Sequence, residues 1–450
     1  MAKSSPRKVL VANSIGGFGE VYDFAIFAFS VPILAMHFFP AQDEAGGVLS
    51  AFTVYAIAFF GRPLGGIMFG YLADRIGRMK VLTTTIFLMA TGTATIGLLP
   101  TYEQIGVAAP ILLFVCRLFQ GMAMGGESTG SVSYVLESAP SNARGRWVGT
   151  IYLATFLPNA FTALLLLLLQ TVLTREVYED WGWRMPFLAG GLIGILGFWL
   201  RKNLQESDEF ENAKREAPVR QNSFAAATST GLRSMLCVFL LLPAVTVSSY
   251  MLIGYMYTFL VKVVGLPTHT ALFSNAAALV VLSLMLPVSG ALSDRFGRRP
   301  LMAAGAIWIM LLGYPALYLI STSGIAGAFA GQIMLAIGIA LYSGAALTAM
   351  PELFPTSFRG TGHAISYQMG VAVFGGSTPL IATWLVKLSG SPVAPGFYIA
   401  MVAALSLLVI KWIPETRHVG LRDSVGGTPG PEPYVPAERL AKVTGEMPQP

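Results

Sequence analysis

The stretch "GYLADRIGRMK", residues 70–80, returns later in the chain as "GALSDRFGRRP", residues 290–300. In both copies an aspartate lies between two glycines and is followed by arginine, and Asp294 comes 220 positions after Asp74. A second pair of stretches, "ESAPSNARG" at 137–145 and "ELFPTSFRG" at 352–360, is separated by 215 positions. Two different motifs repeated at nearly the same offset indicate that the chain arose by duplication of one unit.

The composition places this duplicated unit in a membrane. Of the 450 residues, 54% are hydrophobic and only 12% are charged, whereas about 25% of the residues in ordinary soluble domains are charged. A soluble protein of this length would need far more polar surface, so we interpret the chain as an integral membrane protein in contact with a lipid bilayer. The two cysteines, Cys116 and Cys237, lie in apolar runs and form neither a disulfide framework nor a zinc motif.

Twelve apolar runs separated by short polar breaks are the expected spans. They are 14–39, 48–73, 81–99, 107–137, 147–173, 183–200, 235–261, 270–292, 300–320, 324–351, 361–388 and 394–413. Each is near or above the roughly 20 residues that cross about 30 Å of hydrocarbon. The sequence therefore predicts an all-α membrane protein with twelve transmembrane helices in two pseudo-symmetric six-helix halves. The halves are expected at 1–200 and 235–415, with a cytoplasmic linker at 201–234 and a flexible cytoplasmic tail at 416–450.

The positive charges predict the orientation of the chain. With both termini in the cytoplasm, the outer segments hold few basic residues, namely Arg175, Arg184, Lys262 and Lys387. The inner segments hold many more: Lys3, Arg7, Lys8, Arg75, Arg78, Lys80, Arg144, Arg146, those from Arg201 to Arg233, Arg295, Arg298, Arg299 and Arg359. This asymmetry fits the positive-inside rule. Because the basic residues follow topology and do not cluster on a soluble module, nucleic acid is not expected as a partner despite the net charge of +6.

The repeated stretches resemble motifs of the major facilitator superfamily, where "GYLADRIGRMK" is similar to the loop between spans 2 and 3. More narrowly, the chain resembles the metabolite–proton symporter family of bacterial carriers for α-ketoglutarate, citrate, shikimate, and proline or betaine. The stretches that carry this narrower resemblance are "GEVYDF", "FFGRPLGGIMFGYLADRIGR", "CRLFQGMAMGGE", "EDWGWRMPF", "RKNLQESDEF" and "FPTSFRGTGHAISYQMGVAVFGGSTPLIATWL". The resemblance implies a bacterial inner-membrane transporter whose halves rock around a substrate bound near the midplane.

Two charged residues of the first half are expected to meet near the membrane midplane. At about 1.5 Å per residue, Asp23 lies about 14 Å into the first span and Arg117 about 15 Å into the fourth. A charge at that depth is costly unless it faces a partner or a cavity, so we predict that the two residues pair. Arg117 would hold an anionic substrate group with its planar guanidinium, and Asp23 would carry the proton. The alternative is an ion pair that only fixes the packing of the spans.

Other polar residues within the spans complete the set of candidates. Glu20 and Glu127 are candidates for proton coupling, and Glu20 is also a candidate gate or packing partner. Arg62 either contacts the substrate or pairs with Glu127 in an inner gate. The remaining candidates for substrate binding are Asn159, Tyr250, Tyr342 and Gln368. For the tyrosines, the alternative is packing in the core or at the membrane interface.

Charged residues at the inner ends of the spans are candidates for gating. They are Asp74, Arg75, Arg78, Glu137 and Arg144 in the first half, and Asp294, Arg295, Arg298, Glu352 and Arg359 in the second. Ion pairs between the halves would hold the outward-open state and break when the inner side opens. The alternative is that these charges only determine topology.

Taken together, these features predict secondary active transport, in which a small organic acid is imported by proton-coupled symport. The alternative is a proton symporter of the proline/betaine type, which carries a zwitterion. The family resemblance implies that carriers of the proline/betaine type often end in a long charged coiled coil. The Pro- and Gly-rich tail of this chain lacks heptads, and this favours the organic acid. There is no Gly-x4-Gly-Lys-Ser/Thr motif for direct use of ATP, and no catalytic or metal motif suggests an enzyme. We expect no cofactor and no metal, and we expect the chain to act as a monomer.

Overall fold

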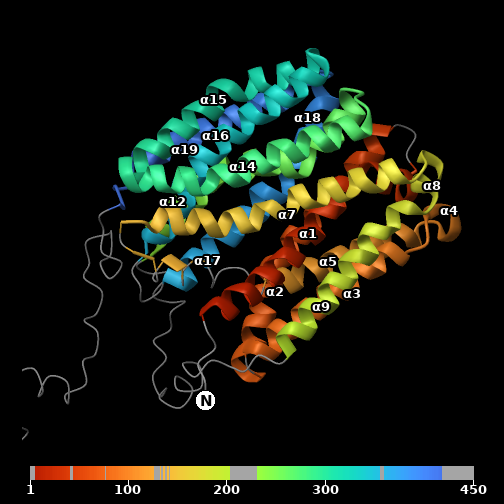
Figure 1. Cartoon of the computed structure of the whole chain (residues 1–450), viewed down its shortest axis with the longest axis horizontal. Helices are drawn as coiled ribbons and strands as arrows, with labels where there is room; N and C mark the ends of the chain where they lie inside the picture. Colours follow the sequence, from red (N-terminus) through yellow and green to blue (C-terminus); the bar gives the residue numbers. More distant parts are fainter. Residues whose placement is uncertain are drawn as a thin grey trace, which may run out of the picture.

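A computed structural model describes residues 6–40, 44–76, 78–125, 132, 135–136, 139–140, 142–202, 231–354 and 359–417. The elements within these residues are helices, which confirms the predicted all-α class (Figure 1). The first half contains α1 (Pro6–Phe38), α2 (Glu44–Ile76), α3 (Arg78–Leu98), α4 (Tyr102–Ile105), α5 (Ala108–Gly125), α7 (Arg144–Val172), α8 (Arg175–Asp180), η1 (Gly182–Arg184) and α9 (Met185–Lys202). The second contains α12 (Leu232–Tyr250), η2 (Met251–Tyr255), α13 (Met256–Thr258), η3 (Phe259–Val263), α14 (Thr268–Phe296), α15 (Arg298–Thr322), α16 (Gly324–Glu352), α17 (Arg359–Gly370), η4 (Val371–Gly375), α18 (Gly376–Ser389) and α19 (Ala394–Ile410).

The helices agree with the twelve predicted spans. Among the described residues, nine helical segments are long and apolar enough to cross a membrane. Three shorter apolar helices, Thr84–Leu98, Gly182–Leu196 and Ala394–Ile410, lie where the third, sixth and twelfth spans were predicted. Helices are the expected form because the hydrocarbon core offers no water to satisfy the peptide groups. The linker predicted at 201–234 and the tail predicted at 416–450 lie largely outside the described residues.

The helices before and after the linker form two groups that meet along α7 and α14 (Figure 1). The backbones of these two helices touch at glycines. A Cβ atom added to Gly290 would lie only 2.0 Å from the carbonyl oxygen of Gly145, and one added to Gly149 would lie 2.6 Å from that of Leu286. Glycine is therefore required at this contact, because any side chain would force the two helices apart.

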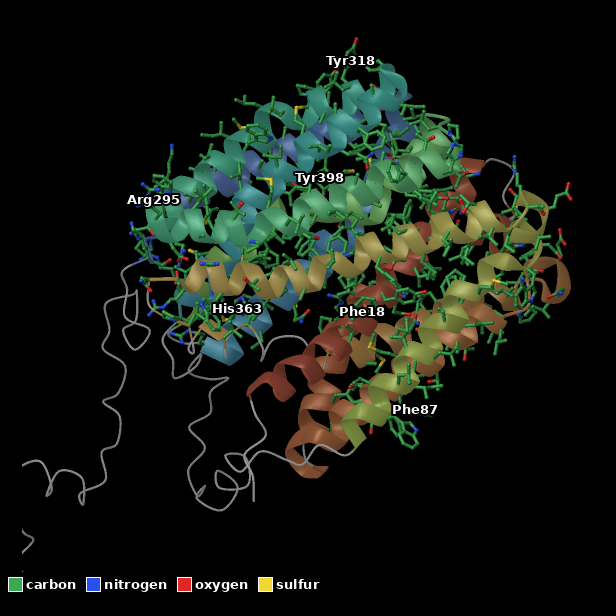
Figure 2. The ribbon with its side chains drawn as sticks, in the orientation of Figure 1. Phe18, Phe87, Arg295, Tyr318, His363 and Tyr398 are labelled. Carbon is green, nitrogen blue, oxygen red and sulfur yellow. The ribbon has the colours of Figure 1, made fainter. Side chains whose placement is uncertain are left out.

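Large apolar side chains cover the outer faces of the bundle. Phe87 is 47% exposed and Tyr318 is 53% exposed, and both point away from the helices in Figure 2. Such surfaces suit contact with lipid. We call the end of the bundle that carries Asp294, Arg298 and Glu352 the Glu352 end; Arg295 lies there in Figure 2. The opposite end, where α1 finishes, is called the His37 end.

Two spans of the second half are interrupted by π-helices. The seventh span changes to a π-helix at η2 and again at η3, and the eleventh does so at η4. A π-turn displaces the regular backbone hydrogen bonds and often marks a functional site. In η2, the Leu252 carbonyl oxygen accepts a hydrogen bond from Asn275 Nδ2 on α14 at 2.9 Å. A side chain from a neighbouring helix therefore supports the irregular backbone of the seventh span.

Candidate functional site

Four buried polar side chains form a hydrogen-bonded group inside the first half, which we call the Asp23 cluster: Asp23 of α1, Thr93 of α3, and Arg117 and Gln120 of α5. Arg117 NH1 donates to Asp23 Oδ2 at 3.3 Å and to Gln120 Oε1 at 3.0 Å. Gln120 Nε2 donates to Asp23 Oδ1 at 2.7 Å and to Thr93 Oγ1 at 3.0 Å. The Thr93 hydroxyl also donates to Asp23 Oδ1. The pair predicted from depth along the spans is therefore present, with two further partners.

Helical spacing and one glycine explain how these side chains converge. Arg117 and Gln120 are three residues apart, so both project from the same face of α5. A Cβ atom at Gly92 would lie 2.9 Å from Gln120 Cγ, so the glycine gives Gln120 room beside α3. Gln120 could have been predicted as a neighbour of Asp23 from its spacing of three residues from Arg117. Thr93 had no such signal, because α3 carries several threonines in similar apolar surroundings.

The guanidinium of Arg117 is held mainly by aromatic rings. Its central carbon lies 4.6 Å from the ring centre of Phe24, 4.3 Å from that of Phe27 and 5.8 Å from that of Tyr55. Within the part of the chain that the structure describes, its Nε and NH2 atoms are buried without a hydrogen-bond partner. Unpaired buried donors are costly, and these two atoms leave Arg117 with donor groups that no described residue satisfies.

Arg62 of α2 is a second arginine beside the same ring. Its guanidinium lies 4.7 Å from the ring centre of Phe24 and 4.4 Å from that of Phe59, and the residue is 6% exposed. Its Nε atom also lacks a partner among the described residues. Glu127, the partner proposed for Arg62 in an inner gate, lies outside the described residues. Both guanidinium groups thus lie against the Phe24 ring, which concentrates positive charge near Asp23.

Tyr250 is a candidate from the second half that packs against these aromatic rings. Its ring packs edge-on against Phe59, with centres 5.1 Å apart. A Cβ atom at Gly375, in η4, would lie 2.8 Å from Tyr250 Cε2, and one at Gly254, in η2, would lie 3.3 Å from the Tyr55 hydroxyl. The π-helices of the seventh and eleventh spans are therefore packed against the aromatic side chains that surround Arg117 and Arg62.

The other substrate candidates have local partners. The buried Tyr342 hydroxyl donates to the Leu241 carbonyl oxygen at 2.9 Å, which ties α16 to α12 and fits the core-packing alternative. Asn159 Nδ2 donates to the Phe156 carbonyl oxygen of its own helix at 3.0 Å. Gln368 is half-buried on α17. Glu20 lies on α1, one turn before Asp23, but its side chain is outside the described part of the structure.

A network of charged side chains occupies the Glu352 end. Arg298 Nε lies 3.3 Å from Glu352 Oε2, and Arg298 NH1 lies 2.7 Å from Asp294 Oδ1. Arg144 of the first half approaches Glu352 of the second, with NH1 and Oε1 4.0 Å apart. Arg359 Nε donates to the Pro351 carbonyl oxygen at 3.1 Å. The network thus includes one charge pair between the two halves, and the gating role of these residues stays a prediction.

Asp294 also crosses between the halves, but its partner there is backbone. Its two carboxylate oxygens accept hydrogen bonds from the amides of Gly145 at 2.8 Å and Arg146 at 2.9 Å. These amides open α7, and a carboxylate at the start of a helix is favoured by the unpaired N–H groups and the helix dipole. A motif of side chains does not predict this contact, because the partners of Asp294 are backbone amides.

The remaining gating candidates either lie outside this network or have side chains that the structure does not describe. Arg295 lies over the Phe296 ring at 5.3 Å and accepts, through its carbonyl oxygen, a hydrogen bond from Arg417 NH1 at 2.7 Å. The side chains of Asp74, Arg75 and Arg78 fall outside the described part of α2 and α3, and Glu137 lies outside the described residues.

The segment after the last span returns to the Glu352 end. The Glu415 carboxylate accepts hydrogen bonds from the amides of Arg298 at 2.8 Å and Arg299 at 3.0 Å, which are the first two residues of α15. Thr416 Oγ1 donates to Glu352 Oε2 at 2.6 Å. Residues 415 and 416 thus cap one helix and supply a donor to the network.

Comparison with known sequences places this arrangement in a family. The profile of the sugar (and other) transporter family matches residues 9–424. A proline/betaine transporter of Escherichia coli (strain K12) is 35% identical over 442 residues, which cover 94% of this chain and 86% of that protein. A putative proline/betaine transporter of Staphylococcus aureus (strain COL) is 33% identical over 412 residues, covering 90% of this chain and 88% of that protein.

Solved structures support the same fold. A crystal structure of the D-xylose–proton symporter superposes with a TM-score of 0.72 at 19% identity, covering 92% of this chain and 99% of that one. The xylose transporter XylE of E. coli, in a partially occluded inward-open conformation, gives a TM-score of 0.71 at 19% identity, over 92% of this chain and all of the other. The resemblance to the major facilitator superfamily is therefore confirmed. The chain belongs to the sugar (and other) transporter family of that superfamily and is a multi-pass membrane transporter, not an enzyme.

Proposed function

We propose that the chain carries a small zwitterion of the proline/betaine class together with H⁺. This replaces the organic acid as the leading substrate, because the curated relatives that cover most of the chain are named proline/betaine transporters. The absence of heptads in the tail was a poor guide to substrate, because the tail lies outside the membrane helices that would hold it. A zwitterion needs two recognition surfaces, one for its carboxylate and one for its cationic nitrogen.

The carboxylate surface is proposed at Arg117. This residue carries the proposal, because its Nε and NH2 atoms are buried and have no hydrogen-bond partner among the described residues. A guanidinium edge with two free N–H groups matches the two oxygens of a carboxylate. Arg62, whose guanidinium lies against the same Phe24 ring, adds positive charge to the region.

The surface for the cationic nitrogen is proposed on the Tyr250 ring of the second half. Tyr55 and Phe59 of α2 extend to Gly254 and Gly376, and Tyr250 packs against Phe59. Faces of aromatic rings attract quaternary ammonium groups. Arg62 lies 4.4 Å from the ring centre of Phe59 and Arg117 lies 5.8 Å from that of Tyr55, so like-charge repulsion directs the nitrogen away from these two rings and toward Tyr250.

Proton coupling is proposed at Asp23. When Asp23 is ionised, it is the negative partner of Arg117. Protonation removes that partner and leaves a buried guanidinium whose charge is uncompensated. The substrate carboxylate restores the balance, so binding of H⁺ favours binding of substrate. We further propose that the Glu352 end is cytoplasmic, with both termini on that side, and that its network opens to release the substrate.

The test is uptake into proteoliposomes that contain the purified full-length protein. With the inside more alkaline than the outside, we expect accumulation of radiolabelled glycine betaine or proline that a protonophore abolishes. Arg117→Lys keeps the positive charge but loses the pair of parallel N–H donors of the guanidinium. Affinity for substrate should therefore fall about tenfold or more, equivalent to about 1.4 kcal/mol. Arg175→Lys is the matched control, because Arg175 is exposed and pairs only with Glu179 in the described structure.

Competition decides the substrate class. Unlabelled betaine and proline should block uptake, whereas citrate and α-ketoglutarate should not. If a dicarboxylate or tricarboxylate competes more strongly than either zwitterion, the zwitterion proposal is wrong. If the protonophore has no effect on accumulation, proton coupling is wrong whichever substrate is carried.

A further inference from the structure

We propose that Thr93 is a positioning residue that lets Asp23 gain and lose a proton without breaking the Asp23 cluster. The inference rests on the proposed proton coupling at Asp23 and adds a residue that the sequence did not reveal. It is carried by the geometry around one hydroxyl group on α3. That hydroxyl is buried, and it contacts polar atoms of three different helices.

The Thr93 hydroxyl lies between two possible acceptors. It reaches Asp23 Oδ1 on α1, and it lies 2.9 Å from the Met89 carbonyl oxygen of its own helix. Gln120 Nε2 of α5 donates to the same hydroxyl oxygen at 3.0 Å. A hydroxyl has one hydrogen and two lone pairs, so it can donate to only one of the two acceptors at a time.

This geometry serves both protonation states of Asp23. With Asp23 ionised, Thr93 donates its hydrogen to Oδ1, beside the donors from Gln120 and Arg117. When a proton binds, an O–H bond forms at Oδ1, and this new group donates to Thr93 Oγ1. Thr93 then turns its own hydrogen to the Met89 carbonyl oxygen. No hydrogen is lost from Thr93, and the charge of the cluster rises by one.

Loss of the hydroxyl should favour the protonated state. A hydrogen bond to an ionised carboxylate is roughly twice as strong as a bond between neutral groups, so the ionised form loses more than the protonated form. The other groups around Asp23 stay in place. They are Arg117 of α5, Tyr22 of α1, whose hydroxyl donates to the Pro186 carbonyl oxygen of α9, and Tyr55 and Arg62 of α2, which contact the Arg117 guanidinium and the Phe24 ring respectively. A shift in Thr93→Val is therefore assignable to the hydroxyl.

Infrared difference spectroscopy of the full-length protein in lipid vesicles measures this directly. The carboxylic-acid band that depends on pH and disappears in Asp23→Asn reports the protonated form. In Thr93→Val, its midpoint should move to higher pH by about one unit, a tenfold rise in proton affinity. Thr93→Ser keeps the hydroxyl and should titrate close to the unsubstituted protein. Thr91→Val is the matched control, because the exposed Thr91 hydroxyl bonds only to the backbone of α3 in the described structure.

The outcomes separate this inference from the proposed function. If the Asp23 band titrates and Thr93→Val leaves its midpoint unchanged, the role of Thr93 is overturned while proton coupling at Asp23 stands. If Thr93→Ser shifts the midpoint as far as Thr93→Val, the hydroxyl is not the cause and the inference also fails. If no Asp23-dependent band titrates, proton coupling at Asp23 is wrong, and the role of Thr93 falls with it. Thr93→Ala, which removes the hydroxyl without adding bulk, replaces Thr93→Val if that variant does not fold.

Discussion

Asp23 and Arg117 form an ion pair in which the two partners are unequally satisfied. The Asp23 oxygens accept hydrogen bonds from Thr93, Gln120 and Arg117. Within the described structure, Arg117 donates hydrogen bonds only through NH1, and its Nε and NH2 atoms have no hydrogen-bond partner. A purely structural ion pair does not require a carboxylate that accepts several hydrogen bonds beside a guanidinium that has unpaired donors. The imbalance favours a role in which Arg117 takes a second anion while Asp23 changes its charge.

Asp23→Asn is expected to separate exchange from accumulation. The amide removes the negative charge and cannot take up the proton, so the site should stay in the form that binds substrate. Substrate exchange across proteoliposomes with equal pH should continue, whereas accumulation driven by a pH gradient should fall at least tenfold. Both are measured with radiolabelled glycine betaine. If accumulation in the variant equals that of the unsubstituted protein, Asp23 does not carry the proton.

Residue-level prediction succeeded where depth alone decides contact. Asp23 and Arg117 were paired because helical rise places them at the same level in the membrane. Thr93 and Gln120 were not identified, because an apolar helix contains other neutral polar residues and depth does not give the direction in which a side chain points. Glu20 and Glu127 remain predictions, since the structure does not describe their side chains.

At the scale of the element, the pairing of α7 with α14 depends on the absence of side chains. Gly290→Ala would place a Cβ atom 2.0 Å from the Gly145 carbonyl oxygen, and the nearest atoms are backbone. Overpacking of this kind costs typically 1–3 kcal/mol, although alanine is intrinsically the better helix former by up to about 1 kcal/mol. We therefore expect a lower unfolding temperature in detergent and slower transport.

The control for this substitution is Gly19→Ala on α1. A Cβ atom there would lie 3.8 Å from the Ile193 side chain, an ordinary contact. It should leave the unfolding temperature unchanged or raise it slightly. Equal unfolding temperatures and transport rates for Gly290→Ala and the unsubstituted protein would show that α7 and α14 do not need this close approach.

The π-helices mark a limit of prediction for elements. Apolar runs predicted the twelve spans because a membrane allows little except helix, but η2 and η4 are packed against side chains of other helices. Asn275 reaches Leu252 from another helix, and Gly375 admits the Tyr250 ring. Nothing in the hydropathy of 235–261 or 361–388 encodes those contacts. The sequence therefore predicted where the spans lie, but the π-helices within them were not predicted.

At the scale of the molecule, Glu352 is a charged residue through which the described parts of the two halves form an ion pair. It lies close to Arg298 of its own half and to Arg144 of the other. Of the two ion pairs of Glu352, the one with Arg144 crosses between the halves, so its loss weakens the closed state; a loss of about 1.4 kcal/mol is enough to shift a two-state equilibrium tenfold. Glu352→Gln is therefore expected to favour the conformation in which the Glu352 end is open.

Spin labels can measure that opening. Trp147→Cys on α7 and Phe296→Cys on α14 replace exposed residues of opposite halves, with Cys116 and Cys237 changed to serine. Adding Glu352→Gln should move the distance distribution between the labels to longer values. Glu179→Gln, which removes the carboxylate of a surface pair, should leave the distribution unchanged. An unchanged distribution in Glu352→Gln would mean that the ion pairs do not hold the halves together.

The repeat predicted that charged residues of both halves meet at one end, and Arg144 and Glu352 do so. It did not predict the binding of Asp294 to the amides that open α7, because motifs describe side chains and the partner here is main chain. The duplication therefore predicted the two-half architecture, but the contact of Asp294 with the amides of α7 could not be predicted from the motifs.

The bonds made by Glu415 and Thr416 have a practical consequence for expression vectors. A stop codon placed before Glu415 would leave the first amides of α15 uncapped and deprive Glu352 of a donor, although every span would still be encoded. A fluorescent reporter joined after Arg417 would keep both bonds. Truncation mapping of this carrier thus has a natural boundary three residues beyond Pro414, well past the last hydrophobic segment.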